Sequence, residues 1–244
     1  MFEDSLRLAV VLNALAERAI SAPFAERALA GGETPHHVHD PEGLLGLDPV
    51  SAVPLRQALA RLEHAPAGRA RPAWALLLPR PGRMAGLRGP LEVNRAALDA
   101  GAVVMTHDGS LAWLGQRVGA GVQWRIALAE RPLPPPDPRE VARLLPRTIA
   151  QVAQELHGLD VTGGERPGPE PAPELGEHYP AASQALVERA WTVLAAAEAG
   201  LAQQHEVLHS HAVLTRERHL RELADAALDA ISASVSWPTR SMEV

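Results

Sequence analysis

The sequence predicts an α+β fold with a small, mainly antiparallel sheet, for three reasons. Residues 67–131 contain short apolar runs and alternating patterns that are typical of strands. Residues 1–66 and 132–244 instead show the 3.6-residue periodicity of amphipathic helices. Asp108-Gly109 lies between two apolar runs and is a strong hairpin signal. We therefore expect residues 1–244 to form a single α+β unit, with a split at the proline-rich connector 132–138 as the alternative.

Apolar stripes and capping residues define the predicted helices. The stripes indicate helices over residues 5–20, 23–30, 54–63, 91–100, 139–157, 182–203 and 212–235. Asp137 to Glu140 resembles a capping box. The helices over 182–203 and 212–235 are expected to form an antiparallel hairpin across a turn at 204–211.

The predicted sheet combines a three-stranded meander with one earlier strand. The buried run 74–78 is the earlier strand, and the meander comprises residues 102–107, 110–118 and 122–128. In the last of these strands Trp124 and Ile126 lie on one face, whereas Gln123 and Arg125 lie on the other. We expect the N-terminal helices and the C-terminal helical hairpin to pack around this sheet.

Composition excludes several classes of function. The formal net charge is -6, so the protein lacks the positive electrostatic field that a nucleic-acid-binding protein usually shows. The absence of cysteine excludes disulfides and a thiol nucleophile, and because all 23 basic residues are arginine, lysine chemistry is excluded as well. The lysine-free composition is typical of a GC-rich bacterial genome. No apolar run is long enough for a membrane span and the first residues are acidic, so we expect a cytoplasmic protein without membrane partners.

The segment 205–209 matches the H-E-x-x-H pattern of zinc hydrolases. On a helix, His205 and His209 would lie on one face and hold a zinc ion, with Glu206 as the general base. Its position at the predicted turn argues against this interpretation, because a turn does not hold the two imidazoles at helical spacing. An exposed helix end and a structural or adventitious metal site are the alternatives.

Two further clusters are weaker candidates for binding sites. One is a histidine cluster formed by His36, His37 and His39, followed by Asp40, which are candidates to bind a metal ion. The alternative for this cluster is a solvated loop without a ligand. Arginine and glycine alternate in the segment 80–89, where Arg80, Arg83 and Arg88 are candidates to bind a small anion. A simple connector between a strand and a helix is the alternative for this segment.

Several short motifs form a distinctive pattern. They are Leu87-Arg88-Gly89-Pro90, Asn94, Ala97-Leu98, Ala100-Gly101 and Val118-Gly119-Ala120-Gly121-Val122-Gln123-Trp124. With the proline connector and the helix after it, this pattern resembles a group of uncharacterised actinobacterial proteins. The resemblance implies a bacterial intracellular protein and carries no activity.

The sequence therefore favours a non-catalytic intracellular binding or interaction protein without a cofactor. Its C-terminal helices, rich in alanine and leucine, are suited to packing against a protein partner or a second copy of the chain. The alternatives are a zinc-dependent hydrolase built on His205, Glu206 and His209, and a small-anion binder at the Arg80–Arg88 loop.

Overall fold

The chain divides into two compact units. The computed structural model describes residues 1–244 except 31–33, 65–72, 159–167, 169–170, 203–209 and 239–244. Unit 1 comprises Met1–Pro135, Leu175–Tyr179 and Val235–Val244, and unit 2 comprises Pro136–Glu174 and Pro180–Ser234. The boundary at Pro135 lies inside the connector 132–138 that the sequence analysis identified.

Unit 1 is built around a six-stranded sheet. Its helices are α1 (Phe2–Ala16), α2 (Ala22–Ala30), α3 (Leu55–Glu63) and α4 (Leu91–Ala100). Its strands are β1 (His36–His39), β2 (Val53–Pro54), β3 (Trp74–Leu77), β4 (Val103–Thr106), β5 (Ala112–Val118) and β6 (Gly121–Ala127). The strand order is β2-β1-β6-β5-β4-β3, and β1 runs parallel to β6 whereas the other neighbouring pairs are antiparallel.

The α+β class is confirmed, but the predicted small, mainly antiparallel sheet is wrong. The four predicted strands occur close to their predicted positions, yet β1 and β2 extend the sheet beyond β6 and make it mixed. The segment His36–His39 lies within residues 32–49, for which the sequence predicts a loop. It becomes a strand through backbone pairing with β6, which local sequence preference does not encode.

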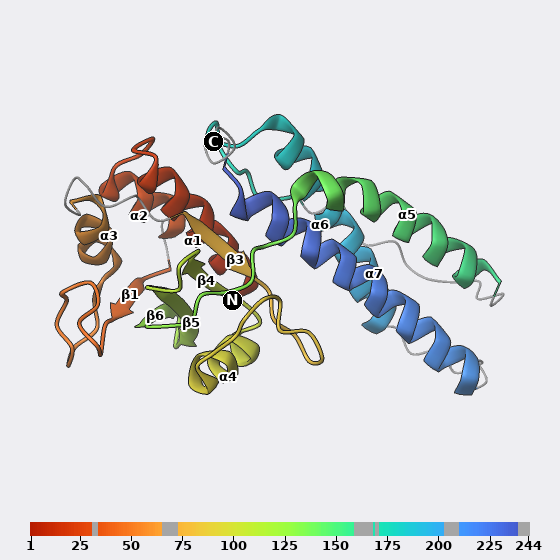
Figure 1. The fold of residues 1–244 in the computed structure, drawn as a ribbon, viewed down its shortest axis with the longest axis horizontal. Helices are drawn as coiled ribbons and strands as arrows, with labels where there is room; N and C mark the ends of the chain where they lie inside the picture. The colour runs from red at the N-terminus through yellow and green to blue at the C-terminus, as the bar shows by residue number, and fades with distance from the viewer. Residues whose placement is uncertain (31–33, 65–72, 159–167, 169–170, 203–209, 239–244) are drawn as a thin grey trace. The chain divides into compact units, whose positions relative to one another are not determined.

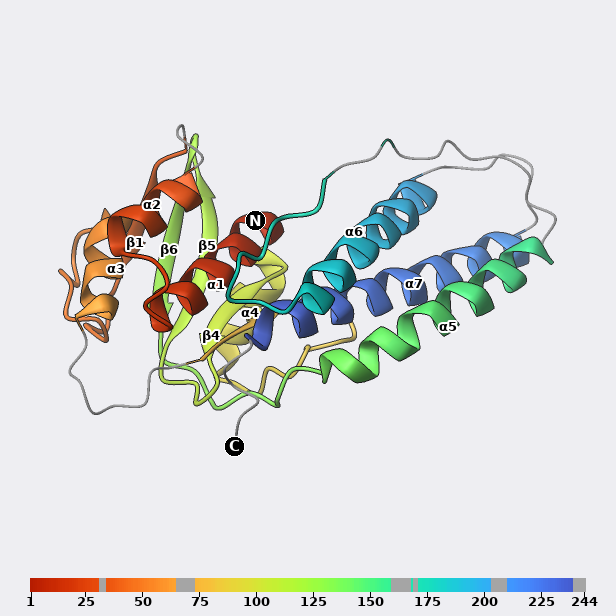
Figure 2. The ribbon, with the colours of Figure 1, turned by 90° about the horizontal axis from the view of Figure 1, so that it is seen from above.

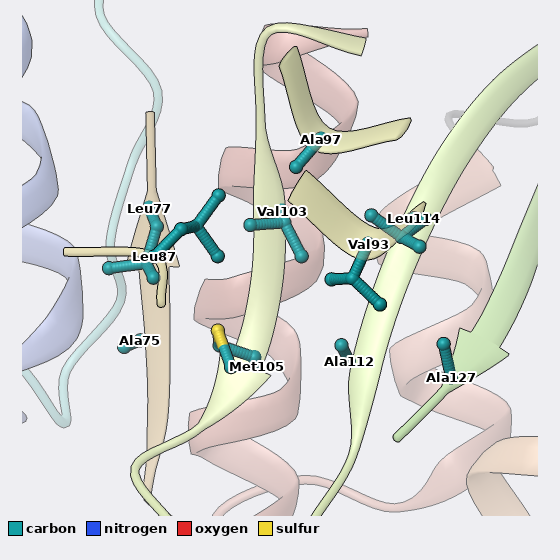
Figure 3. Packing of buried hydrophobic residues seen from close by; sticks show 10 residues of the cluster. All are labelled: Ala75, Leu77, Leu87, Val93, Ala97, Val103, Met105, Ala112, Leu114 and Ala127. Carbon is teal, nitrogen blue, oxygen red and sulfur yellow. The ribbon is translucent and has the colours of Figure 1, made fainter. Parts of the chain in front are cut away.

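Helices cover the two faces of the sheet. Figure 1 shows α1 on one side of the strands and α4 on the other. On the α4 face, Val93 and Ala97 pack against strand residues that include Val103 and Leu114 (Figure 3). On the opposite face, Trp74, Trp113 and Trp124 are fully buried, and neighbouring rings contact edge to face with centroids 6.5 Å apart. Apolar burial on both faces is the main source of stability for this unit.

Asn13 of α1 forms hydrogen bonds with backbone groups at the free edge of β3. Its Nδ2 donates to the carbonyl of Trp74 at 3.0 Å, and its Oδ1 accepts from the Trp74 amide at 3.0 Å. The same Nδ2 also lies 3.0 Å from the hydroxyl of Tyr179, which donates to the carbonyl of Val235. The hydroxyl of Ser236 accepts from the next outward amide, that of Leu76. Side chains thus replace the missing neighbour of an edge strand.

His36 joins β1 to β6 on the buried tryptophan face. Trp124 Nε1 donates to His36 Nδ1 at 3.0 Å, and the two rings stack. Burial lowers the pKa of His36, as does the charge of Arg117, whereas the charge of Asp4 opposes them. The imidazole is therefore neutral in the folded protein, with Nδ1 as its hydrogen-bond acceptor.

Unit 2 consists of three helices in the part of the chain that the structure describes, and Figure 2 shows them from above. They are α5 (Pro138–His157), α6 (Ala181–Ala202) and α7 (Ser210–Ser236), whose last two residues belong to unit 1. Asp137 caps α5, because its side chain accepts from the amides of Arg139 and Glu140. The guanidinium of Arg216 in α7 donates to the carbonyl of Gly200 near the end of α6. Most of the predicted turn at 204–211 lies outside the described residues.

The Asn13→Ala substitution tests whether the edge of β3 depends on this amide. It would leave the buried N–H and C=O of Trp74 without partners, so we expect the free energy of unfolding to fall by about 3 kcal/mol. Urea unfolding followed by tryptophan fluorescence measures the loss. The matched control is Asn94→Ala, because Asn94 Oδ1 has no hydrogen-bond partner among the described residues. If both variants lose the same small amount of unfolding free energy, the edge of β3 does not depend on the Asn13 amide.

Acidification is expected to destabilise the protein partly through His36. An unfolded histidine takes up a proton near pH 6.5, whereas the folded pKa of His36 is lower, so stability is complete above pH 6.5 and falls as the pH drops below it. His36→Asn keeps an acceptor for Trp124 and removes this titration, so the fall in Tm between pH 7 and pH 5 becomes smaller. A residual fall is expected because burial also lowers the pKa values of His107 and His178.

The control for this measurement is His37→Asn, because His37 is exposed and lies one residue away on the other face of β1. Its fall in Tm should match that of the wild type. If the Tm of His36→Asn falls as much between pH 7 and pH 5 as the Tm of the wild type, the neutral buried imidazole is not the cause of the acid destabilisation.

Candidate functional site

A groove of about 560 Å³ in unit 1 is lined by the end of α4 and by strands of the sheet, with residues from both faces. This volume is within the range of small-molecule binding sites. The residues that line the groove are Met1, His39, Ala96, Asp99, Ala100, Leu114, Gly115, Gln116, Arg117, Gln123 and Arg125. Strands β1, β5 and β6 supply most of its surface, and the last turns of α4 supply Ala96, Asp99 and Ala100.

Strand register places the polar side chains of the groove together. Arg125 is paired with His39 on β1 and with Leu114 on β5. Gln123 is paired in the same way with Gln116. Directly paired residues project from the same face of a sheet, and Leu114 belongs to the cluster under α4, so the two glutamines and Arg125 share the α4 face. The apolar packing under α4 therefore gives way to a polar surface over β6 and β1.

The charges of the groove differ in how they are compensated. Arg117 donates to the carboxylate of Asp4 at 3.1 Å. The ring nitrogen Nε2 of His39 donates to the carbonyl of Pro49 at 3.2 Å. Arg125 is half-buried, and it forms neither a hydrogen bond nor an ion pair with any residue that the structure describes. An unpaired guanidinium that lines a groove is suited to bind a carboxylate through two parallel hydrogen bonds.

The structure separates the histidines of the predicted metal cluster. His36 is buried on the tryptophan face, whereas His37 and His39 project from the opposite face of β1. Asp40 is fully buried and accepts from the amides of Leu44 and Leu45 at 2.8 Å, so it fixes the loop that follows β1. Among the described residues, no group of three histidine, aspartate or glutamate side chains is placed to hold a metal ion.

The arginines of the predicted anion site do not line the groove. Arg80 and Arg83 form a tight backbone bridge, and the Arg80 guanidinium donates to the carbonyl of Leu78 at 3.0 Å. Arg88 is exposed. The zinc motif 205–209 lies outside the described residues, so zinc binding by His205 and His209 with Glu206 as base stays a prediction, as does anion binding by the arginine loop.

Of the residues that line the groove, the sequence predicted only His39 as a site residue, and as a metal ligand. It placed Gln123 and Arg125 on one face of a strand, but it interpreted no site there, because the strand that completes that face was assigned to a loop. The available signal was an arginine and a glutamine at alternate positions of a strand whose other face is apolar.

Comparisons with known proteins identify a family and no activity. No curated protein and no solved structure matches the chain. No helix in the described part of the chain has the length and apolar character that a membrane crossing requires. The family described as "Rv1486c-like protein, N-terminal domain" matches residues 5–140, which is more than half of the chain. The expected resemblance to actinobacterial proteins of unknown function is confirmed, and the chain belongs to the Rv1486c-like family.

Proposed function

We propose that this protein is a non-catalytic intracellular binding protein whose unit 1 holds a small carboxylate ligand in the groove. Arg125 is the anchor for the carboxylate. The observation that carries this proposal is the position of Arg125, which lines the groove and has no partner among the described residues.

The surroundings of Arg125 favour a ligand with a single negative charge at this end. Gln116 and Gln123 offer amide N–H donors on the same face, and donors of this kind fix the orientation of a ligand. The second arginine of the groove, Arg117, is already neutralised by Asp4. One uncompensated guanidinium matches a carboxylate better than a doubly charged phosphate, for which several cations usually converge.

The groove suggests binding rather than catalysis. Neutral amides, a compensated arginine and small apolar side chains make up most of its lining. The one histidine in the lining, His39, has its Nε2 engaged by Pro49. These groups recognise a ligand through hydrogen bonds and apolar contacts.

The Arg125→Gln substitution tests the anchor. Thermal-shift screening of the full chain against aliphatic monocarboxylates, free L-amino acids and N-acetyl amino acids identifies binders, and calorimetry then gives Kd. Loss of a charged hydrogen-bonded pair should raise Kd roughly tenfold to hundredfold. Arg95→Gln is the control with the same change in charge, because Arg95 is exposed on α4 and does not line the groove.

The proposal is wrong if no carboxylate in the screen binds. It is also wrong if Arg125→Gln binds as tightly as the wild type, since the anchor would then lie elsewhere. Loss of binding in both Arg125→Gln and Arg95→Gln would indicate a general charge effect and would contradict the specific role of Arg125.

A further inference from the structure

We infer that the ligand of the groove is zwitterionic, with an ammonium group that Asp99 recognises while Arg125 holds the carboxylate. This inference rests on the proposed function and specifies the chemical class of the ligand as a free α-amino acid.

Two opposite charges in the groove are left uncompensated. Asp99 and Arg125 both line it, yet they form no ion pair with each other or with any other residue in the described part of the chain. The other charged groups of the lining, the guanidinium of Arg117 and the ammonium of Met1, both contact the carboxylate of Asp4. Asp99 and Arg125 are therefore the charges of the groove that lack a partner among the described residues, and a ligand with one positive and one negative group complements both of them.

The position of Asp99 on α4 supports a cationic partner. It is the last residue but one of the helix, which ends at Ala100 with Gly101 in the left-handed conformation. The carbonyl end of a helix carries a partial negative charge, so a carboxylate there is unfavourable in the absence of a cation. The last turn of α4 contains no basic residue. Asp99 thus adds negative charge where the helix already favours a positive ligand group.

The apolar residues of the groove indicate what the ligand carries besides its charges. Ala96 and Ala100 are one helical turn apart on α4, and with Leu114 they are apolar residues in the lining of the groove. This surface accommodates a small aliphatic group. The groove of about 560 Å³ is also large enough for an amino acid with such a side chain.

A comparison of matched ligands tests the inference. The twenty L-amino acids and their N-acetyl derivatives are titrated into the full chain, because N-acetylation removes the ammonium charge and keeps the carboxylate. We expect at least one free amino acid to bind about tenfold more tightly than its N-acetyl form. Asp99→Asn should weaken the binding of that amino acid about tenfold and leave the binding of its N-acetyl form unchanged. Arg125→Gln should weaken the binding of both ligands.

Glu92→Gln is the matched control, because Glu92 is exposed in the first turn of α4 and does not line the groove. Asp99→Asn should also raise the Tm of the ligand-free protein slightly relative to this control, since it removes a carboxylate from a helix C-terminus.

The outcomes separate the two proposals. If N-acetyl amino acids bind as tightly as free ones and Asp99→Asn changes neither, the zwitterion inference is overturned while the Arg125 site stands. If no free amino acid binds, the inference is overturned even where another carboxylate binds. If no carboxylate of any kind binds, both proposals fail.

Discussion

The parallel pairing of β1 with β6 is the constraint on which the groove depends. The hydrogen bond from Trp124 to His36 fixes this pairing on the buried face. Because successive side chains alternate between faces, burying His36 places His39 beside Arg125 on the other face. A shift of one residue would bury the charged row and expose the tryptophan row, so the core and the groove are specified by the same register.

The opposite edge of the sheet is fixed by side chains rather than by another strand. Asn13 binds both outward backbone groups of Trp74, and Ser236 accepts from Leu76. Burial raises the pKa of Tyr179, so its hydroxyl stays protonated and donates to Val235. Residues that are far apart in the sequence thus complete one edge of the sheet that carries the groove.

The sequence predicted those elements whose patterns are local. The meander follows from Asp108-Gly109 and from alternation in β6, and Asp137 does cap α5 as its spacing indicated. The strand His36–His39 lacks an apolar alternation because a polar residue, His36, occupies one of its two buried positions. The partners of Asn13 and the neighbours of Arg125 lie between 11 and 222 residues away, so no local pattern could reveal them. Of the predicted histidine cluster, His39 lines the groove, whereas Arg80, Arg83 and Arg88 of the predicted anion site do not.

The most direct test of the account is an NMR titration that follows side-chain N–H signals while a binding carboxylate is added. We predict saturable shifts in the Nε–Hε signal of Arg125 and in the amide signals of Gln116 and Gln123, because all three line the groove on the α4 face. The signal of the exposed Arg88 should remain unchanged. Saturable shifts at Arg88 with none at Arg125 would show that the groove is not the binding site.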